Sequence, residues 1–236
     1  MGKALLAFVL LFQAATDDKA AIDDAIKRFN KAVANPSPAA RATALLELSK
    51  TPHDRTLKVI SNYLNMDVTD VRIAAAKSMV EFGDWKKIVT PSLANALTTN
   101  EKDAKVQSAI LDSIGKLADP ASLNTVHGNF RDTDARVAKS AIGAAGTMRQ
   151  KESMDALVAL QADVQKWLKN KQAGPYRKDD GQQGDDNEIK GRLDGIQKSI
   201  IKAFQDITKE KWATANEWEI WWGKKKATFE IPPDTK

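Results

Sequence analysis

Small and apolar residues recur along this chain at the spacing of one face of an α-helix. Counting from Val71, Val106 and Val137, such residues follow at offsets of 3, 4, 7, 8 and 11 positions. The three sets are Val71, Ala74, Ala75, Ser78, Met79 and Phe82; Val106, Ala109, Ile110, Ser113, Ile114 and Leu117; and Val137, Ser140, Ala141, Ala144, Ala145 and Met148. Residues at these offsets lie on one side of a helix. Each stretch therefore predicts a helix with one buried face.

A second apolar helix is predicted after each of these helices, beyond a short break. The breaks lie at Thr51–Pro52, Gly83–Asp84, Asp119–Pro120 and Arg149–Glu152. Proline just inside a helix, preceded by aspartate or threonine, is typical of a helix start. The second helices carry Leu57, Ile60 and Leu64; Val89, Leu93 and Leu97; Leu123, Val126 and Phe130; and Leu157, Leu160, Val164 and Trp167.

These helix pairs repeat along the chain. A weaker first copy begins at Ala40 and places Glu47 at a buried position, so the copies start at 40, 71, 106 and 137, at intervals of 31, 35 and 31 residues. A two-helix unit of this length cannot bury its apolar face alone and needs neighbours on both sides. The pattern predicts an all-α solenoid.

The last quarter of the chain departs from the repeat. Residues 169–188 contain glycine, proline and a cluster of aspartates, which predicts a polar inserted loop. The apolar stripe resumes from Leu193 to Ile207, and four tryptophans follow within the last 25 residues, at 212, 218, 221 and 222. A solenoid needs a cap over its terminal apolar face, which is the role we expect for these tryptophans. The tail Ile231-Pro232-Pro233 is expected to be solvated.

The N-terminus predicts a location for the protein. One lysine, Lys3, precedes the uninterrupted apolar run Ala4–Phe12, and small residues and then aspartates follow. This order is typical of a secretory signal peptide, although Phe12 or Gln13 stands where a small residue is preferred before cleavage. Nine apolar residues are too few to span a bilayer, which takes about 20. We expect export to the periplasm or cell envelope; a cytoplasmic protein with a buried or interfacial N-terminal helix is the alternative.

Composition narrows the remaining chemistry. The 236 residues include no cysteine, which excludes disulfides and cysteine-based metal sites. The formal net charge of +5 is modest, and it is only a weak indication of anionic partners.

Three segments resemble HEAT repeats of the short bacterial type: DVRIAAAKSMVEFGD, KVQSAILDSIGKLAD and ARVAKSAIGAAGTM. The segment FQDITKEKWATANEWEIWWGKKK looks like the closing element of exported bacterial HEAT-repeat proteins, with Lys209 in place of the usual glycine. The resemblance covers residues 36–223. It implies a HEAT-like α-solenoid, a right-handed superhelix of antiparallel helix pairs, and it implies little about function because HEAT arrays mostly hold partners.

The resulting organisation has five parts. They are a signal peptide in residues 1–15, an N-terminal helix in 16–35, HEAT-like repeats in 36–168, a polar inserted loop in 169–188, and a final helix with a Trp-rich cap in 189–236.

The sequence contains no recognisable catalytic or metal-binding motif. Both histidines, His53 and His127, have structural interpretations, at a helix start and on a partly buried helix face respectively. No nucleophile elbow, phosphate loop or zinc motif occurs. The carboxylates of Asp179–Glu188 lack the alternating spacing of a calcium loop. We expect no enzymatic activity and no cofactor.

The function predicted from these observations is a non-catalytic scaffold that binds a protein partner on the concave face of the solenoid. By analogy with HEAT arrays, the second helices line that face. The partner-binding residues expected there are Lys58, Asn62, Lys86, Lys87, Asn95, Asn129 and Arg131. Two alternatives remain: a nucleic-acid-binding protein that uses the same mildly basic surface together with Arg55 and Asn124, and a carbohydrate-binding module that uses exposed C-terminal tryptophans. Partner identity and oligomeric state are not encoded in any recognisable motif.

Overall fold

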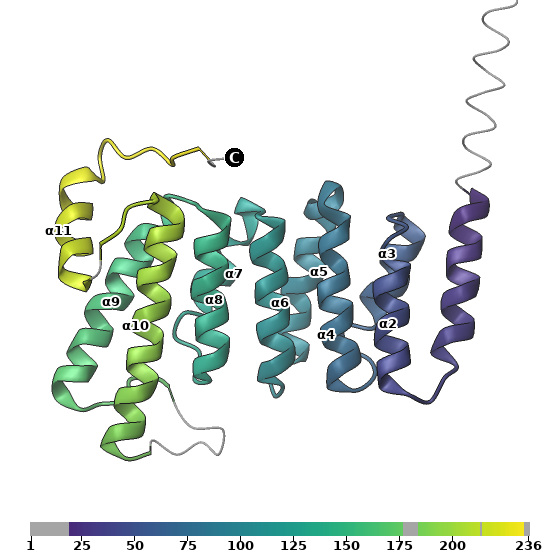
Figure 1. The fold of residues 1–236 in the computed structure, drawn as a ribbon, viewed down its shortest axis with the longest axis horizontal. Coiled ribbons are helices and arrows are strands. Elements are labelled where there is room, and N and C mark those ends of the chain that lie inside the picture. The colour runs from purple at the N-terminus through teal and green to yellow at the C-terminus, as the bar shows by residue number, and fades with distance from the viewer. Residues whose placement is uncertain (1–18, 177–183, 213, 234–236) are drawn as a thin grey trace, which may run out of the picture. The chain divides into compact units, whose positions relative to one another are not determined.

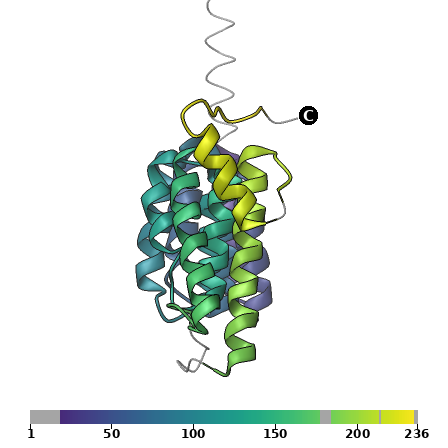
Figure 2. The ribbon, with the colours of Figure 1, turned by 90° about the vertical axis from the view of Figure 1, so that its left-hand side faces the viewer.

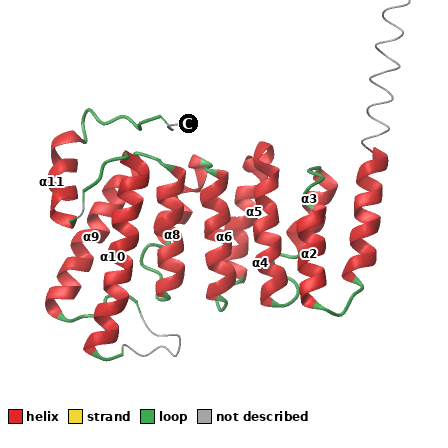
Figure 3. Cartoon of the chain, viewed as in Figure 1, coloured by secondary structure: helices red, strands yellow, loops and turns green. Residues whose placement is uncertain are grey.

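Helices account for the regular structure of the described residues, as Figure 3 shows, and no strand occurs among them. The computed structural model describes residues 19–176, 184–212 and 214–233. These form two compact units, one ending at Trp85 and the other beginning at Lys86, and each is considered by itself. The predicted signal peptide lies outside the described residues.

The first unit begins with a helix over residues 19–33. It continues with α2 (Pro38–Leu48), α3 (Asp54–Asn62), α4 (Thr69–Ser78) and the 3₁₀ helix η1 (Met79–Trp85). The first helix buries Ile22, Ala25 and Phe29, and the Phe29 ring meets Tyr63 edge-on at a centroid distance of 5.6 Å. Its remaining residues are mostly polar and exposed, as expected of the helix that closes one end of a helical stack.

The first repeat differs from the predicted register by one residue. Glu47 is exposed and pairs with Lys50 at 2.7 Å, whereas Leu45 and Leu48 are buried. The buried face of α2 therefore starts at Arg41 rather than Ala40. A long basic side chain can occupy this position because its aliphatic stem packs inward while its guanidinium reaches out to a partner, here Asp67 at 2.6 Å.

The second unit consists of two layers of helices and a cap (Figure 1). The first layer contains α6 (Ala104–Leu117), α8 (Ala135–Met148) and α10 (Asp186–Thr208), with α8 packed between the other two. The second layer contains α5 (Lys86–Thr99), α7 (Leu123–Gly128, preceded by the short 3₁₀ helix η2, Pro120–Ser122) and α9 (Glu152–Asn170). Successive helices along the chain therefore alternate between the two layers, as the predicted repeat of helix pairs requires.

The predicted stripes are the buried faces of α4, α6 and α8. Every residue of the Val71 and Val106 sets is buried, and in the Val137 set only Ser140 is partly exposed. The second helices likewise bury their predicted residues, except that Leu123 and Trp167 are half-buried. Periodicity predicts these faces well because helix geometry alone decides which side chains share a side.

Two of the four C-terminal tryptophans, Trp218 and Trp222, are buried, and Trp212 and Trp221 are half-buried. Helix α11 (Ala215–Lys225) crosses the ends of α9 and α10, as Figure 2 shows. Trp218 and Trp222 are buried, and their indole N–H groups donate to the Trp212 carbonyl at 3.1 Å and to Asp155 at 2.8 Å respectively. Neighbouring side chains cover the rings of Trp218 and Trp222, whereas the ring of Trp221 is only half-buried.

Two segments outside the helices are partly buried. In the predicted inserted loop, Ala173 and Tyr176 are buried and the Tyr176 hydroxyl donates to the Phe130 carbonyl at 3.0 Å. The C-terminal tail is not free in solvent either. Ile231 and Pro232 are half-buried, and Arg149 donates to the Pro232 carbonyl. Neither contact follows from local sequence, because each joins segments far apart along the chain. Within the described residues, no helix is both long and apolar enough to cross a membrane.

Candidate partner-binding surface

The predicted binding residues are divided between the two units. Lys58 and Asn62 lie on α3 of the first unit, four residues apart and both exposed, so they share one face of that helix. The neighbouring Arg55 pairs with Asp23 of the 19–33 helix at 2.6 Å. The other five predicted residues lie in the second unit.

Helix α5 presents an exposed stripe at intervals of four residues. Lys87, Pro91 and Asn95 are all exposed on it. Lys86 is half-buried and lies on the inner side, because the residues three and four positions later, Val89 and Thr90, are buried. The structure thus brings Lys87 and Asn95 together on one face and places Lys86 on another.

The connection from α7 to α8 supplies two further predicted residues. Asn129 ends α7, and its side-chain amide donates to the Thr125 carbonyl at 2.8 Å. Arg131 donates twice to Asp163 of α9, from Nη2 at 2.6 Å and from Nε at 3.2 Å. Charge-assisted bonds to a single carboxylate hold the guanidinium in one place. Arg131 therefore fastens the α7–α8 connection to α9.

Beside Arg131 the surface is hollowed into a pocket of about 610 Å³ at the end of α9. The residues that line it come from the α7–α8 connection, from the last turns of α9 and from the segment after α9. They are Arg131, Trp167, Lys171, Gln172, Ala173, Gly174 and Pro175. Trp167 is half-buried, so part of its indole is exposed here.

The pocket wall is held in place by tight packing. A Cβ atom on Gly174 would lie 2.6 Å from Cδ2 of Trp167, and Gly174 has a φ of +62°. Only glycine meets both conditions, since it has no Cβ and tolerates positive φ. Tyr176 meets Trp167 edge-on at a centroid distance of 5.8 Å. Desolvation by burial raises the pKa of the Tyr176 phenol, which stays a neutral hydrogen-bond donor.

Arg131 is one of the predicted partner-binding residues, whereas Trp167, which also lines this pocket, is not among them. The helical period places Trp167 with Leu160 and Val164, so it was interpreted as a core residue. Trp167 lies in the last turn of α9, where the elements that cover the helix end. The Lys-Gln-Ala-Gly-Pro sequence that follows α9 marks this helix end, and it is the sequence signal that Trp167 could be partly exposed. Ile88 was also missed; it is 63% exposed next to Lys87.

The two histidines have structural contacts, as predicted. His53 precedes α3 and accepts from the Arg55 backbone N–H at 3.2 Å, so it caps that helix. His127 is half-buried with its Nε2 at 2.9 Å from the Ser153 hydroxyl, and desolvation by burial lowers its pKa.

The carboxylates of the inserted loop are described only in part. Residues 179–183 lie outside the described residues. Asp185 caps α10 by accepting from the N–H groups of Asn187 and Glu188, while Glu188 accepts from the Asp185 N–H. Within the described residues, no group of three or more histidine, aspartate or glutamate side chains is placed to hold a metal ion.

Comparison with known proteins agrees with the helix-pair architecture. Residues 90–171, which run from α5 to just past the end of α9, match the family model of HEAT repeats. No curated protein matches the chain. The chain is thus an all-α solenoid of HEAT-like helix pairs. HEAT repeats commonly serve as protein-interaction scaffolds.

Proposed function

We propose that this protein is a non-catalytic scaffold that binds a protein partner through the second-layer helices of the unit formed by residues 86–236. The pocket beside Trp167 and Arg131 is the observation that carries the proposal. Tryptophan and arginine dominate the binding energy of protein interfaces, and here both line one hollow on a rigid support. The exposed stripe of α5, with Ile88 beside it, would extend the contact.

The charges of this surface favour a protein partner over nucleic acid. Arg131 is paired with Asp163, and Lys171 with Asp186 at 3.1 Å. In the first unit, Arg55 is likewise paired with Asp23. Tight binding to nucleic acid draws on about six to ten phosphate contacts, and the carboxylate beside each of these three cations would repel a phosphate. A partner with mixed charge can bind without opening these ion pairs.

We also propose that the protein acts in the periplasm or cell envelope. The support is the N-terminal composition, a basic residue followed by the apolar run Ala4–Phe12 and small residues. The intact mass of the native protein and its cell fraction test this directly. A start near Ala15–Asp17 in the envelope fraction is expected. An intact N-terminus in the cytoplasm would contradict the location and leave the binding surface untouched.

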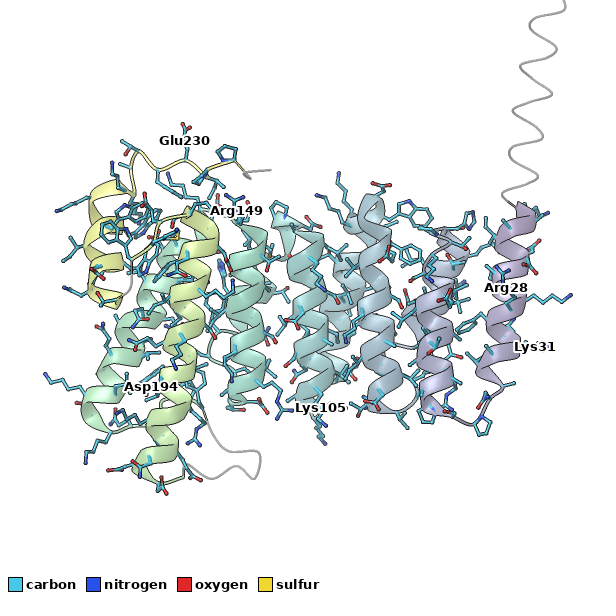
Figure 4. The ribbon with its side chains drawn as sticks, in the orientation of Figure 1. Arg28, Lys31, Lys105, Arg149, Asp194 and Glu230 are labelled. Atoms are coloured by element: carbon cyan, nitrogen blue, oxygen red, sulfur yellow. The ribbon has the colours of Figure 1, made fainter. Side chains whose placement is uncertain are left out.

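A photo-crosslinking amino acid at chosen positions tests the binding surface. Replacement of Asn95 and of Gln172 places the reactive group on the α5 stripe and in the pocket. Replacement of Lys105, exposed near the start of α6 in the other layer (Figure 4), is the matched control. We expect one defined crosslinked species from positions 95 and 172 and none from 105.

A charge exchange makes the test specific. In the variant Arg131→Asp with Asp163→Arg, the ion pair is retained but its two charges change places. The fold is expected to survive, and the crosslink from position 172 is expected to fall at least tenfold. Equal crosslinking in the exchanged variant, or from position 105, would show that this surface is not the binding site. Retention on DNA that decreases steeply with salt would favour the nucleic-acid alternative instead.

A further inference from the structure

The C-terminal tail lies across the turn between α8 and α9. After α11 the chain continues as an extended segment, residues 229–233, with no helical or strand hydrogen bonding. Its backbone carbonyls accept from two basic side chains of the turn: Lys151 Nζ donates to Phe229 at 2.8 Å, and Arg149 Nη2 donates to Pro232. Figure 4 shows Arg149 close beneath the tail that carries Glu230. The turn thus contacts the tail backbone at two points three residues apart.

An aromatic contact fastens the start of this segment. The Phe229 ring meets Trp221 and Trp222 edge-on, at centroid distances of 5.6 Å to each. Trp222 is itself held by its bond to Asp155, which also pairs with Lys226 at 2.7 Å. The two indoles therefore form a fixed platform for one aromatic side chain.

The sequence of the tail is suited to binding as an extended peptide. Pro232 and Pro233 fix their own φ angles, and the residue before each proline is restricted to extended conformations. Such a segment loses little conformational entropy when it binds. In the extended polyproline conformation, which has three residues per turn, Phe229 and Pro232 would lie on the same side of the segment. Those are the two residues whose carbonyls the turn contacts.

We propose that Trp221, Trp222, Arg149 and Lys151 form a recognition surface for extended segments of partner proteins in which an aromatic residue precedes a proline pair by three positions. The tail occupies this surface as an intramolecular competitor. The contacts that define recognition, an aromatic platform and donors to backbone carbonyls, are those of peptide-binding modules that recognise proline-containing segments. Recognition specifies only the aromatic ring and the prolines of the bound segment, because Arg149 and Lys151 donate to backbone carbonyls, which every residue has.

This surface is separate from the pocket beside Trp167. Lys151 directly precedes α9 and Lys171 directly follows it, and 19 helical residues span about 28 Å. The inference therefore does not depend on the proposed scaffold function. It adds a second binding surface, blocked in the resting protein, to the same unit.

The test uses the full chain and a labelled peptide with the tail sequence TFEIPPDT. A tethered tail acts at an effective concentration in the millimolar range, so the unmodified protein is expected to bind the peptide very weakly. The variant Phe229→Ala loses the aromatic anchor, frees the surface, and is expected to bind at least about tenfold more tightly, measured by fluorescence anisotropy. Glu230→Ala is the matched control, because Glu230 is exposed and neighbours the anchor.

Further variants separate the outcomes. The double variant Phe229→Ala with Lys151→Ala is expected to lose the gain, and peptides with alanine for phenylalanine or for both prolines are expected not to bind. A second tail variant, Pro232→Gly with Pro233→Gly, loosens the other end and should also increase binding. If both tail variants keep the helicity of the parent and neither binds the peptide, the proposal is wrong. Dimers that form through exchange of tails between two copies would also overturn it, because the tail would then not be an intramolecular competitor.

Discussion

Gly115 of α6 and Ala144 of α8 are in backbone contact: a Cβ atom on Gly115 would lie 2.8 Å from the Cα of Ala144. The next pair of helices repeats the relationship, since a Cβ on Gly146 of α8 would lie 2.9 Å from the Cα of Ala203 on α10. Small residues at these crossings let the three first-layer helices approach closely. Gly115, Gly146 and the alanines opposite them are therefore packing requirements of the stack.

Gly115→Ala is expected to destabilise the second unit by about 1–3 kcal/mol. The added methyl group would overlap backbone atoms of α8, which cannot rotate away as a side chain could. The matched control is Gly143→Ala on α8, where a Cβ would meet nothing within 4 Å. There the substitution is expected to stabilise by about 0.5–1 kcal/mol, because alanine favours a helix over glycine. Chemical denaturation of the two variants measures the difference, and equal stabilities would contradict the close packing.

Ala118→Gly is expected to increase stability by about 0.5–1 kcal/mol. Ala118 ends α6 in the left-handed conformation, with a φ of 50° and a ψ of 41°. That conformation costs a residue with a Cβ about 1–2 kcal/mol, which glycine avoids at a smaller cost in entropy. Ala162→Gly, on the exposed face of α9, tests the opposite case and should destabilise by about 1 kcal/mol. Thermal unfolding followed by circular dichroism distinguishes them.

Tyr176→Phe is expected to destabilise the protein by about 1–2 kcal/mol. The substitution removes the donor to the buried Phe130 carbonyl while the ring still packs against Trp167. Hydrogen exchange should increase first in residues 171–176. Tyr63→Phe is the control in the first unit, because the contact of Tyr63 is through its ring. A loss of stability in the control as large as in Tyr176→Phe would contradict the role of the hydroxyl.

Stability is expected to decrease as the pH falls below about 4. The hydrogen bond from Arg41 lowers the pKa of Asp67, and hydrogen bonds from Lys226 and Trp222 lower the pKa of Asp155. A carboxyl with a lowered folded-state pKa stabilises the fold above its unfolded value of about 3.9. It loses that contribution as the pH falls through the folded value, since the unfolded state binds the proton first.

The variants Asp67→Asn and Asp155→Asn are expected to reduce this dependence. Each should be less stable than the parent at pH 7, and the difference should shrink as the pH falls and the parent carboxyls become protonated. Urea denaturation at a series of pH values measures the effect. Glu101→Gln, exposed between α5 and α6, serves as the control with a smaller change. Parallel pH profiles for the parent and both variants would show that these ion pairs do not contribute.

The register of the first repeat shows where sequence reasoning reaches its limit. The 3.6-residue period predicted the buried faces of α4, α6 and α8 because the apolar side chains of each helix all lie on one side of it. On α2 the pattern is weaker, and the predicted start at Ala40 places Glu47 at a buried position. The structure places Arg41 at the start of the buried face instead, where it donates to Asp67, 26 residues away.

The sequence by itself determined that the chain is all-α, that its helices pair and which faces of α4, α6 and α8 are buried. These properties depend on spacing within single helices, which is local and can be read from the order of residues. The tertiary structure alone decided that Trp167 lies beside Arg131, that Tyr176 reaches Phe130 and that the tail meets Arg149. Each of these contacts joins segments far apart in sequence. Their geometry depends on how helices of different length stack, and no local period carries that information.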